Sequence, residues 1–181
     1  MPPKPWKTLS SRIVYENPWR RVREDVVELP NGKTTLYSVV ECGDCVGVLP
    51  FLDDDQVVMV RQFRYPLAES HRWEIPAGGV GAGESPEAAA HRELREEIGY
   101  DAGRLAHVAS VHTSNAVLDE VAHIYLGYSL IQAHAVPDET EFLEVAVLSF
   151  RAVYDLVLSG EIRDSLTTIA VLHAARLRGW G

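Results

Sequence analysis

The chain has 181 residues, a formal net charge of −9, and a composition that is 46% hydrophobic and 24% charged. This is the composition of an ordinary globular domain, and the length is enough to bury a core without disulfide bonds. The acidic balance, and lysines and arginines that are spread along the chain, argue against a nucleic-acid partner, which requires a basic surface.

No apolar run approaches the roughly 18 residues that cross a bilayer, so no membrane partner is expected. The first residues, "MPPKPWKTLSS", contain prolines and lysines but no apolar segment of the kind that a secretory signal needs. A cytoplasmic location is therefore the expectation.

Strand patterns dominate the first part of the chain. "RRVREDVVEL" alternates and is followed by the turn signal Pro30-Asn31-Gly32-Lys33, which predicts a hairpin with "TTLYSVVEC" as its return strand. "VGVLPFL" and "VVMVRQFRY" predict two strands joined by the acidic turn "DDDQ". "RWEIPAGG" predicts a short strand that runs into a glycine loop. Further strands are predicted at "LAHVASVHT", "VAHIYLGYSL" and "EVAVLSF".

Two cysteines, Cys42 and Cys45, form a CxxC motif. A redox motif of this type begins a helix, and a zinc site needs a second pair of ligands at suitable spacing. Here Gly43 and Asp44 resemble a turn between two strand-like runs. The favoured interpretation is two structural cysteines that flank a hairpin turn.

Three helices are predicted, over residues 86–98, 150–158 and 165–178. Ser85 is a suitable N-cap for the first, Pro86 suits its first position, and Gly99 ends it. Asp164 or Ser165 is the cap of the third. Many strands and few helices predict an α+β fold with a mixed β-sheet flanked by helices. The first segment of the chain is expected to form its own antiparallel sheet, either packed on the main domain or exchanged with a second copy.

The first predicted helix carries a cluster of glutamates. Glu93 and Glu97 are one turn apart and Glu96 lies beside both, so that their carboxylates can converge. Hard cations such as Mg²⁺ and Mn²⁺ prefer oxygen ligands of this kind. The preceding glycine loop, "PAGGVGAGES", can point a backbone carbonyl at the same ion. Taken alone, the cluster is equally compatible with a solvated acidic surface.

The spacing of these residues resembles the Nudix box, Gly-x5-Glu-x7-Arg-Glu-U-x-Glu-Glu-x-Gly-U, in which U is aliphatic. The positions that match are Gly78, Glu84, Arg92, Glu93, Leu94, Glu96, Glu97 and Gly99. The one departure is Tyr100 at the last U position. Such a long frame of fixed positions is a specific signal.

The resemblance implies an α/β/α Nudix sandwich whose loop–helix–loop binds two or three Mg²⁺ or Mn²⁺ ions. Carried over by position, Glu93 and Glu97 are the principal metal ligands and catalytic residues, and Glu96 shares a further ion. The backbone oxygen of Ala77 completes the coordination, and Glu84 has a supporting role. The family typically hydrolyses a nucleoside diphosphate linked to another group. The cations neutralise the diphosphate and acidify the attacking water.

Outside the box, "RWEIPAGG", "HTSNAVLDEVAHIYLG" and the stretch from "DETEFLEVAVLSF" onward resemble the ADP-ribose pyrophosphatase and nucleotide-sugar hydrolase branch. This branch implies residues 1–42 as N-terminal strands for dimerisation and residues 43–181 as the catalytic domain. It further implies a homodimer in which the N-terminal strands are swapped, with each active site completed by both chains.

The same resemblance assigns substrate roles. Glu139 in "PDETE" matches a loop glutamate that acts as general base, with Glu141 as second choice; a solvated acidic turn is the alternative. Arg64 matches an arginine that reaches the diphosphate, although it can equally be an exposed strand residue. Trp19 lies near a position that stacks on the nucleobase or is buried in the dimer interface. Glu120 is a weaker candidate for holding substrate or water.

Two departures bear on specificity. ADP-ribose hydrolases commonly carry a proline about 16 residues beyond the last box glycine, where this chain has residues 112–115, "HTSN". Some relatives also carry an Arg-Glu pair where this chain reads "TTLYSVV". These differences favour a broad hydrolase that takes ADP-ribose or GDP-mannose and releases a nucleoside monophosphate and a sugar phosphate. The alternatives are a nucleotide-binding domain without activity, and a hydrolase for dinucleoside polyphosphates or coenzyme A.

Overall fold

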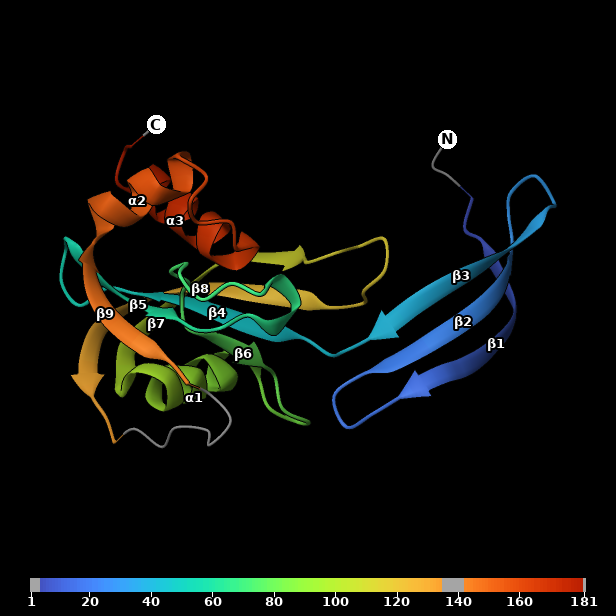
Figure 1. Ribbon diagram of the computed structural model, residues 1–181, viewed down its shortest axis with the longest axis horizontal. Helices are drawn as coiled ribbons and strands as arrows, with labels where there is room; N and C mark the ends of the chain where they lie inside the picture. Colours follow the sequence, from blue (N-terminus) through green and yellow to red (C-terminus); the bar gives the residue numbers. More distant parts are fainter. Residues whose placement is uncertain (1–3, 135–141, 181) are drawn as a thin grey trace. The chain divides into compact units, whose positions relative to one another are not determined.

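The computed structural model describes residues 4–134 and 142–180 (Figure 1). The strands are β1 (Lys7–Glu16), β2 (Arg21–Glu28), β3 (Thr34–Glu41), β4 (Cys45–Pro50), β5 (Gln56–Arg61), β6 (Ala77–Gly79), β7 (Tyr100–His112), β8 (Val121–Gln132) and β9 (Glu144–Ser149). The helices are the short 3₁₀ helix η1 (Tyr65–Leu67) and α1 (Pro86–Ile98), α2 (Phe150–Leu158) and α3 (Ser165–Leu177). The chain divides into two compact units, Met1–Gly43 with His112–Val121, and Asp44–Val111 with Ala122–Gly181.

The first unit contains a three-stranded antiparallel sheet in the order β1-β2-β3. The predicted hairpin between β2 and β3 is confirmed, and Gly32 in its turn has a φ of +78°. Strand β1 was not predicted. Its pairing with β2 shifts register twice, between Thr8 and Ser10 and between Ile13 and Tyr15. Such irregularities break the two-residue alternation by which a strand is recognised in a sequence.

The second unit contains a mixed four-stranded sheet in the order β6-β4-β8-β7, in which β4 is parallel to β8 and antiparallel to β6. Strands β5 and β9 form an antiparallel pair. An antiparallel bridge between Phe51 and Val57 joins the two sides of the turn from β4 to β5. The predicted α+β fold with a mixed sheet is therefore confirmed. The hairpin predicted around the two cysteines is wrong, because β3 and β4 belong to different sheets.

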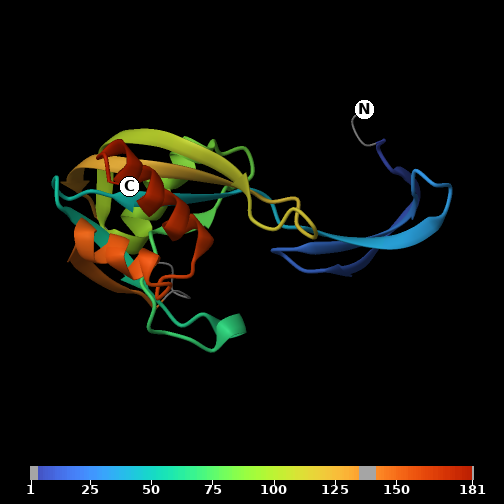
Figure 2. The same cartoon turned by 90° about the horizontal axis from the view of Figure 1, so that it is seen from above.

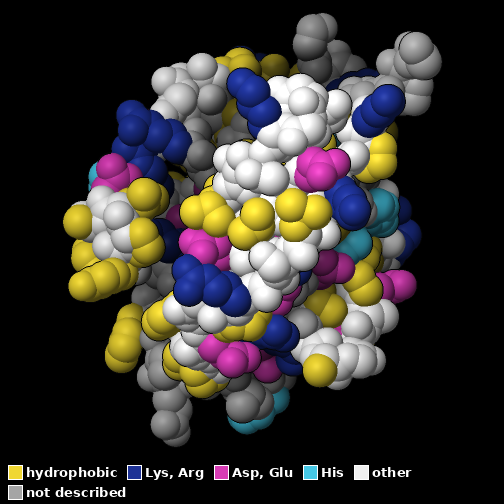
Figure 3. Space-filling view, turned by 90° about the vertical axis from the view of Figure 1, so that its right-hand side faces the viewer, with side chains coloured by type: hydrophobic (Ala, Val, Ile, Leu, Met, Phe, Trp, Pro, Cys, Tyr) yellow, Lys and Arg dark blue, Asp and Glu magenta, His cyan; other side chains and the backbone are white. Residues whose placement is uncertain are grey.

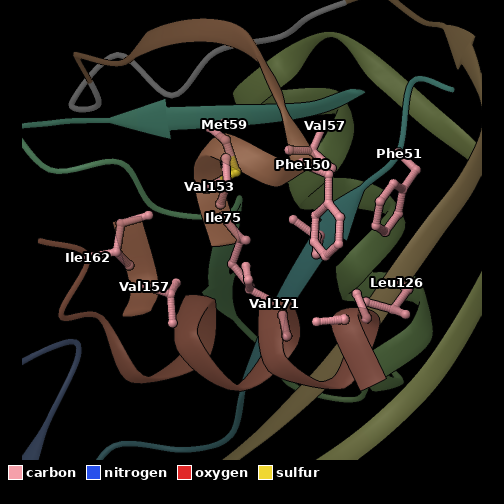
Figure 4. Close-up of a cluster of buried hydrophobic side chains, with 14 of the residues drawn as sticks. Phe51, Val57, Met59, Ile75, Leu126, Phe150, Val153, Val157, Ile162 and Val171 are labelled. Atoms are coloured by element: carbon pink, nitrogen blue, oxygen red, sulfur yellow. The ribbon is translucent and has the colours of Figure 1, made fainter. Parts of the chain in front are cut away.

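Helices cover both faces of the strands in the second unit (Figure 1). Helices α2 and α3 lie on one face and α1 lies on the other, and Figure 2 shows α2 and α3 from above. The larger core cluster includes Phe51, Met59, Phe150 and Val171, between the strands and the α2–α3 pair (Figure 4). A second cluster, which includes Val46 and Leu94, lies between the strands and α1. Strands β4 and β5 are thus buried from both sides.

The helix boundaries agree with the sequence-based predictions. Helix α1 spans the predicted residues, and its N-cap Ser85 accepts a hydrogen bond from the backbone N–H of Ala88. Gly99 ends it with a φ of +69°, which favours glycine. Helix α2 also matches, and α3 begins after the cap Asp164 and ends one residue earlier than predicted. Strand β5 is shorter than predicted, since it ends at Arg61 and η1 follows.

Charges of both signs are distributed over the surface. On the face drawn in Figure 3, basic and acidic side chains are interspersed, with no continuous basic area among the described residues. Within the described part of the chain, no helix combines the length and apolar character that a membrane span requires.

Candidate active site

The start of β6 and the middle of α1 form the centre of the candidate site. The carboxylate of Glu93 lies directly against Gly78, where an added Cβ would come 2.1 Å from Glu93 Oε1. The backbone N–H of Ala77 donates to Glu97 Oε2 over 3.1 Å. Both carboxylates are buried, each 6% exposed. The loop and the helix therefore meet through two carboxylates.

Arg92 connects the carboxylates at the start of α1. Its Nη1 donates to Glu93 Oε1 over 2.6 Å and to Glu96 Oε2 over 2.9 Å. Its Nη2 donates to Glu84 Oε2 over 3.0 Å and to the Gly79 carbonyl over 2.8 Å. The hydrogen bond to Glu84 is the main reason that the pKa of Arg92 is raised, and the same bond lowers the pKa of Glu84. The repulsion among the glutamates is thus offset by one guanidinium.

The donor set fits a divalent cation in its chemistry. Three carboxylates on one helix and the carbonyl of Ala77 are hard oxygen ligands, and the missing side chain at Gly78 leaves space for the Glu93 carboxylate. Among the described residues, however, no three acidic, histidine or cysteine side chains already converge at metal-binding distance. The carboxylates that would hold the ion are instead engaged by Arg92 and by the Ala77 N–H.

Arg64 follows β5 and is engaged in an ion pair with Glu74. Its Nε lies 3.0 Å from Glu74 Oε2, and its Nη2 also contacts this oxygen. Glu74 is only 9% exposed, and it is fixed by paired backbone hydrogen bonds with Val60 of β5. The hydrogen bond to Glu74 is the main cause of a raised pKa at Arg64, and the charges of Asp164 and Glu97 act in the same direction. Arg64 is therefore within electrostatic range of Glu97 on α1.

Glu74 was not predicted from the sequence as a functional residue. Its signal was a lone carboxylate between the apolar residues Trp73 and Ile75. An acidic residue at such a position needs a partner when it is buried.

Trp19 and Glu120 belong to the first unit. Trp19 is 78% exposed, in a turn where Asn17 Oδ1 accepts hydrogen bonds from the N–H groups of Trp19 and Arg20. Glu120 Oε2 accepts a hydrogen bond from Thr113 Oγ1 over 2.5 Å. Glu120 also faces Cys42, whose pKa is raised by burial and then by this carboxylate.

Glu139 and Glu141, the candidates for the general base, lie outside the described residues. Cys42 and Cys45 are both half-buried, and Gly43 between them has a φ of +74°.

Comparison with known families agrees with this geometry. Residues 43–167 match the NUDIX domain, and residues 6–40 match the nucleoside diphosphate sugar hydrolase N-terminal domain. Since the NUDIX match covers more than half of the chain, the protein belongs to the Nudix hydrolase family. Members of this family are enzymes that act on diphosphate bonds and generally depend on divalent metal ions.

Individual relatives are similar along most of their length. The chain is 36% identical to an ADP-ribose pyrophosphatase of Bacillus subtilis, with 92% of this chain and 91% of the relative covered. It is 35% identical, over the same shares, to a methanol dehydrogenase activator of Bacillus methanolicus. A crystal structure of an ADP compounds hydrolase has the same fold, with a TM-score of 0.88 at 20% identity, covering 99% of this chain and 97% of that one.

Proposed function

We propose that this protein hydrolyses the diphosphate of nucleoside diphosphate sugars, such as ADP-ribose or GDP-mannose, to a nucleoside monophosphate and a sugar phosphate. The observation that carries the proposal is the pairing of the two buried carboxylates of α1 with β6, Glu93 against Gly78 and Glu97 on the Ala77 N–H. The match of the first unit to the N-terminal domain of nucleoside diphosphate sugar hydrolases supports this class of substrate.

The residues of the second unit have distinct proposed tasks. Glu93, Glu96, Glu97 and the carbonyl of Ala77 hold Mg²⁺ or Mn²⁺, and the family resemblance implies two or three such ions. Bound cations supply charge neutralisation for the diphosphate and acidify a water molecule. Arg64, already aligned by Glu74, presents a guanidinium that suits forked contacts with phosphate oxygens.

The test of this function compares the wild type with Glu97→Gln on ADP-ribose and GDP-mannose in the presence of Mg²⁺. The amide oxygen of Gln can still accept the Ala77 N–H, so the fold should persist, but the charge that holds a cation is lost. We expect release of AMP or GMP by the wild type and a loss of at least about 100-fold in the variant. Glu87→Gln, an exposed residue in the first turn of the same helix, is the control. Equal turnover in wild type and Glu97→Gln would contradict the proposal.

For the general base we propose Glu139, with Glu141 as the second candidate. Glu139→Gln is expected to lower kcat by about 100-fold or more, and Glu141→Gln by much less, as is usual for loss of a positioned proton acceptor. The opposite order would assign the base to Glu141, and no effect of either would place the base elsewhere.

A homodimer with swapped N-terminal strands is also part of the proposal, with residues 1–42 for dimerisation and 43–181 for catalysis. The support is the large apolar surface that the sheet of the first unit leaves exposed in one chain. These exposed side chains include Trp6, Leu9, Ile13, Val14, Tyr15 and Leu36. Trp19 and Glu120, in the same unit, are proposed to contact substrate in the assembled dimer.

The main alternative is a protein that binds nucleotides without cleaving them. The name of the Bacillus methanolicus relative describes an activator of another enzyme, and it applies to that protein. Tight calorimetric binding of ADP-ribose without product after long incubation would favour this alternative. Turnover of dinucleoside polyphosphates or coenzyme A in place of nucleotide sugars would instead change the substrate class.

A further inference from the structure

A cavity of about 470 Å³ opens in the second unit, beside the candidate active site. One wall is the segment from Arg64 to Glu74, and the other is the start of α3 from Arg163 to Ser165. Small-molecule sites commonly have volumes of about 300–1,000 Å³. The cavity is therefore large enough to receive one part of a substrate.

Hydrogen bonds connect the cavity to the segment that carries Ala77, one of the proposed metal ligands. The side chain of Asp164 caps α3 and accepts a hydrogen bond from Thr167 Oγ1 over 2.6 Å. Thr167 Oγ1 in turn accepts the backbone N–H of Ile75 over 3.0 Å. Ile75 lies two residues before Ala77, whose carbonyl is a proposed metal ligand. A group bound in the cavity would thus be held at a fixed position relative to the diphosphate.

The charges of the cavity favour a neutral ligand. Its lining contains three arginines and three carboxylates, and these are arranged in contacts with one another or with backbone. Arg64 pairs with Glu74, and Arg72 Nε donates to Glu69 Oε2 over 2.6 Å. An incoming anion would meet the carboxylates of Glu69 and Asp164 as well as the arginines. A phosphate group in addition to the diphosphate is therefore poorly suited to this space.

The lining also distinguishes a sugar from a nucleobase. Among the described lining residues there is no aromatic ring, so the cavity offers no stacking surface for a base. It offers guanidinium and carboxylate groups, which donate to and accept from hydroxyls, and one apolar side chain, Leu67. Arg163 is exposed and donates through Nε to the Gly160 carbonyl over 3.2 Å. Within the described part of the chain, its two terminal nitrogens have no hydrogen-bond partner.

We propose that this cavity binds the neutral sugar ring of the nucleoside diphosphate sugar, and that Arg163 is a specificity-determining residue that donates to the sugar hydroxyls. The inference rests on the proposed function and deepens it by assigning the sugar to one place in the structure.

The experiment compares kcat/KM for ADP-ribose, ADP-glucose and the β-methyl ester of ADP, which has no sugar on the second phosphate. Arg163→Ala is expected to lower kcat/KM for the two sugar nucleotides by about tenfold or more, the usual effect of losing hydrogen bonds from a charged donor. The methyl ester should change by less than about twofold, because only binding to the sugar is lost. Arg163→Lys, which keeps the charge, should lie between wild type and Arg163→Ala. Arg176→Ala, at the opposite end of α3, is the matched control and should behave as wild type.

Several results would overturn the inference. Equal losses on the sugar nucleotides and the methyl ester would show that Arg163 acts on the diphosphate or on the fold. Unchanged kinetics on all three substrates would remove Arg163 from recognition. A changed preference among ADP-, GDP- and UDP-glucose in Arg163→Ala would place the nucleobase in the cavity. Absence of turnover by the wild type on any of these substrates would overturn the proposed function itself, and is distinguishable from the other results.

Discussion

Gly78 lies directly against the carboxylate of Glu93, so a side chain at position 78 would collide with this carboxylate. A methyl group there would come 2.1 Å from Glu93 Oε1, so Gly78→Ala must displace the carboxylate. Displacing a catalytic group by about 1 Å can reduce a rate by about 100-fold. We therefore expect a loss of this order in kcat/KM for nucleotide sugars.

The neighbouring glycine provides the control for this prediction. A Cβ at Gly79 meets nothing within 4 Å, so Gly79→Ala should keep most of the activity. Circular dichroism and melting temperature of both variants show whether the fold is retained. Full activity in Gly78→Ala would mean that the position of the Glu93 carboxylate does not matter for the reaction.

A second prediction at the scale of single residues concerns Glu69. The hydrogen bond from Arg72 lowers the pKa of Glu69 below its ordinary value of 4.5. Because the pKa is lower in the folded protein, the pair adds stability above the ordinary pKa, and this contribution is lost as the pH falls through the folded pKa. A carboxyl-carbon NMR titration should show Glu69 titrating at lower pH than a free glutamate. In Arg72→Ala the pKa of Glu69 should return toward 4.5, and an unchanged titration would contradict the pairing.

At the scale of elements, helix α1 combines its caps with an acidic cluster that needs a counter-charge. Ser85 and Gly99 define its ends, and Arg92 contacts three glutamates, Glu84, Glu93 and Glu96. A divalent cation would add to this counter-charge at the carboxylates of the same helix. The helix is therefore expected to be more stable when the cation is bound.

Mg²⁺ should consequently raise the melting temperature of the protein. At a concentration 100 times its Kd, a bound ligand adds about 2.7 kcal/mol to the free energy of unfolding. For a chain of this size, each kcal/mol raises the melting temperature by about 2–4 °C, so a shift of roughly 5–10 °C is expected. Differential scanning fluorimetry with a Mg²⁺ titration measures it.

Two variants of α1 separate specific binding from a general salt effect. The shift should largely disappear in Glu93→Gln and persist in Glu87→Gln. A shift of equal size in both variants, or no shift in the wild type, would weaken the assignment of the metal site to α1.

At the scale of the whole molecule, the first unit has a sheet but little apolar core of its own. All residues of β1 are exposed, and a three-stranded sheet needs a covered apolar face to be stable. The second unit contains both core clusters. In the first unit, Val27 of β2 is the one buried hydrophobic residue among those that the structure describes. This imbalance supports a dimer in which a second copy covers the exposed apolar side chains.

Light scattering should therefore give a molar mass near twice 20.1 kDa. Leu36→Glu in β3 is expected to shift the protein toward monomer, because a carboxylate would be buried in the interface without a partner. Leu158→Glu in α2 is a matched control, since Leu36 and Leu158 are both 61% exposed. A monomer at micromolar concentration in the wild type, or equal dissociation of both variants, would contradict the dimer.

The sequence by itself determined the helices and the identity of the candidate metal ligands. The limits of α1 follow from Ser85, Pro86 and Gly99, which act on the backbone next to them and need no distant contact. The candidate ligand set is what the resemblance of Gly78, Glu84 and the glutamates of α1 to the Nudix box implies, whereas the glutamate cluster alone was equally compatible with a solvated acidic surface. The positions of most strands along the chain were also predicted, because the alternation of apolar and polar residues reflects the burial of one face.

Only the tertiary structure decided what depends on distant segments. Strand β1 was not predicted because its register shifts disturb the alternation of apolar and polar residues. The two cysteines lie at a connection between two different sheets rather than at a hairpin turn. The cavity that Arg64 and Glu74 share with Arg163 joins segments far apart in the chain. This cavity arises from the packing of α3 against the strands, which no local pattern encodes.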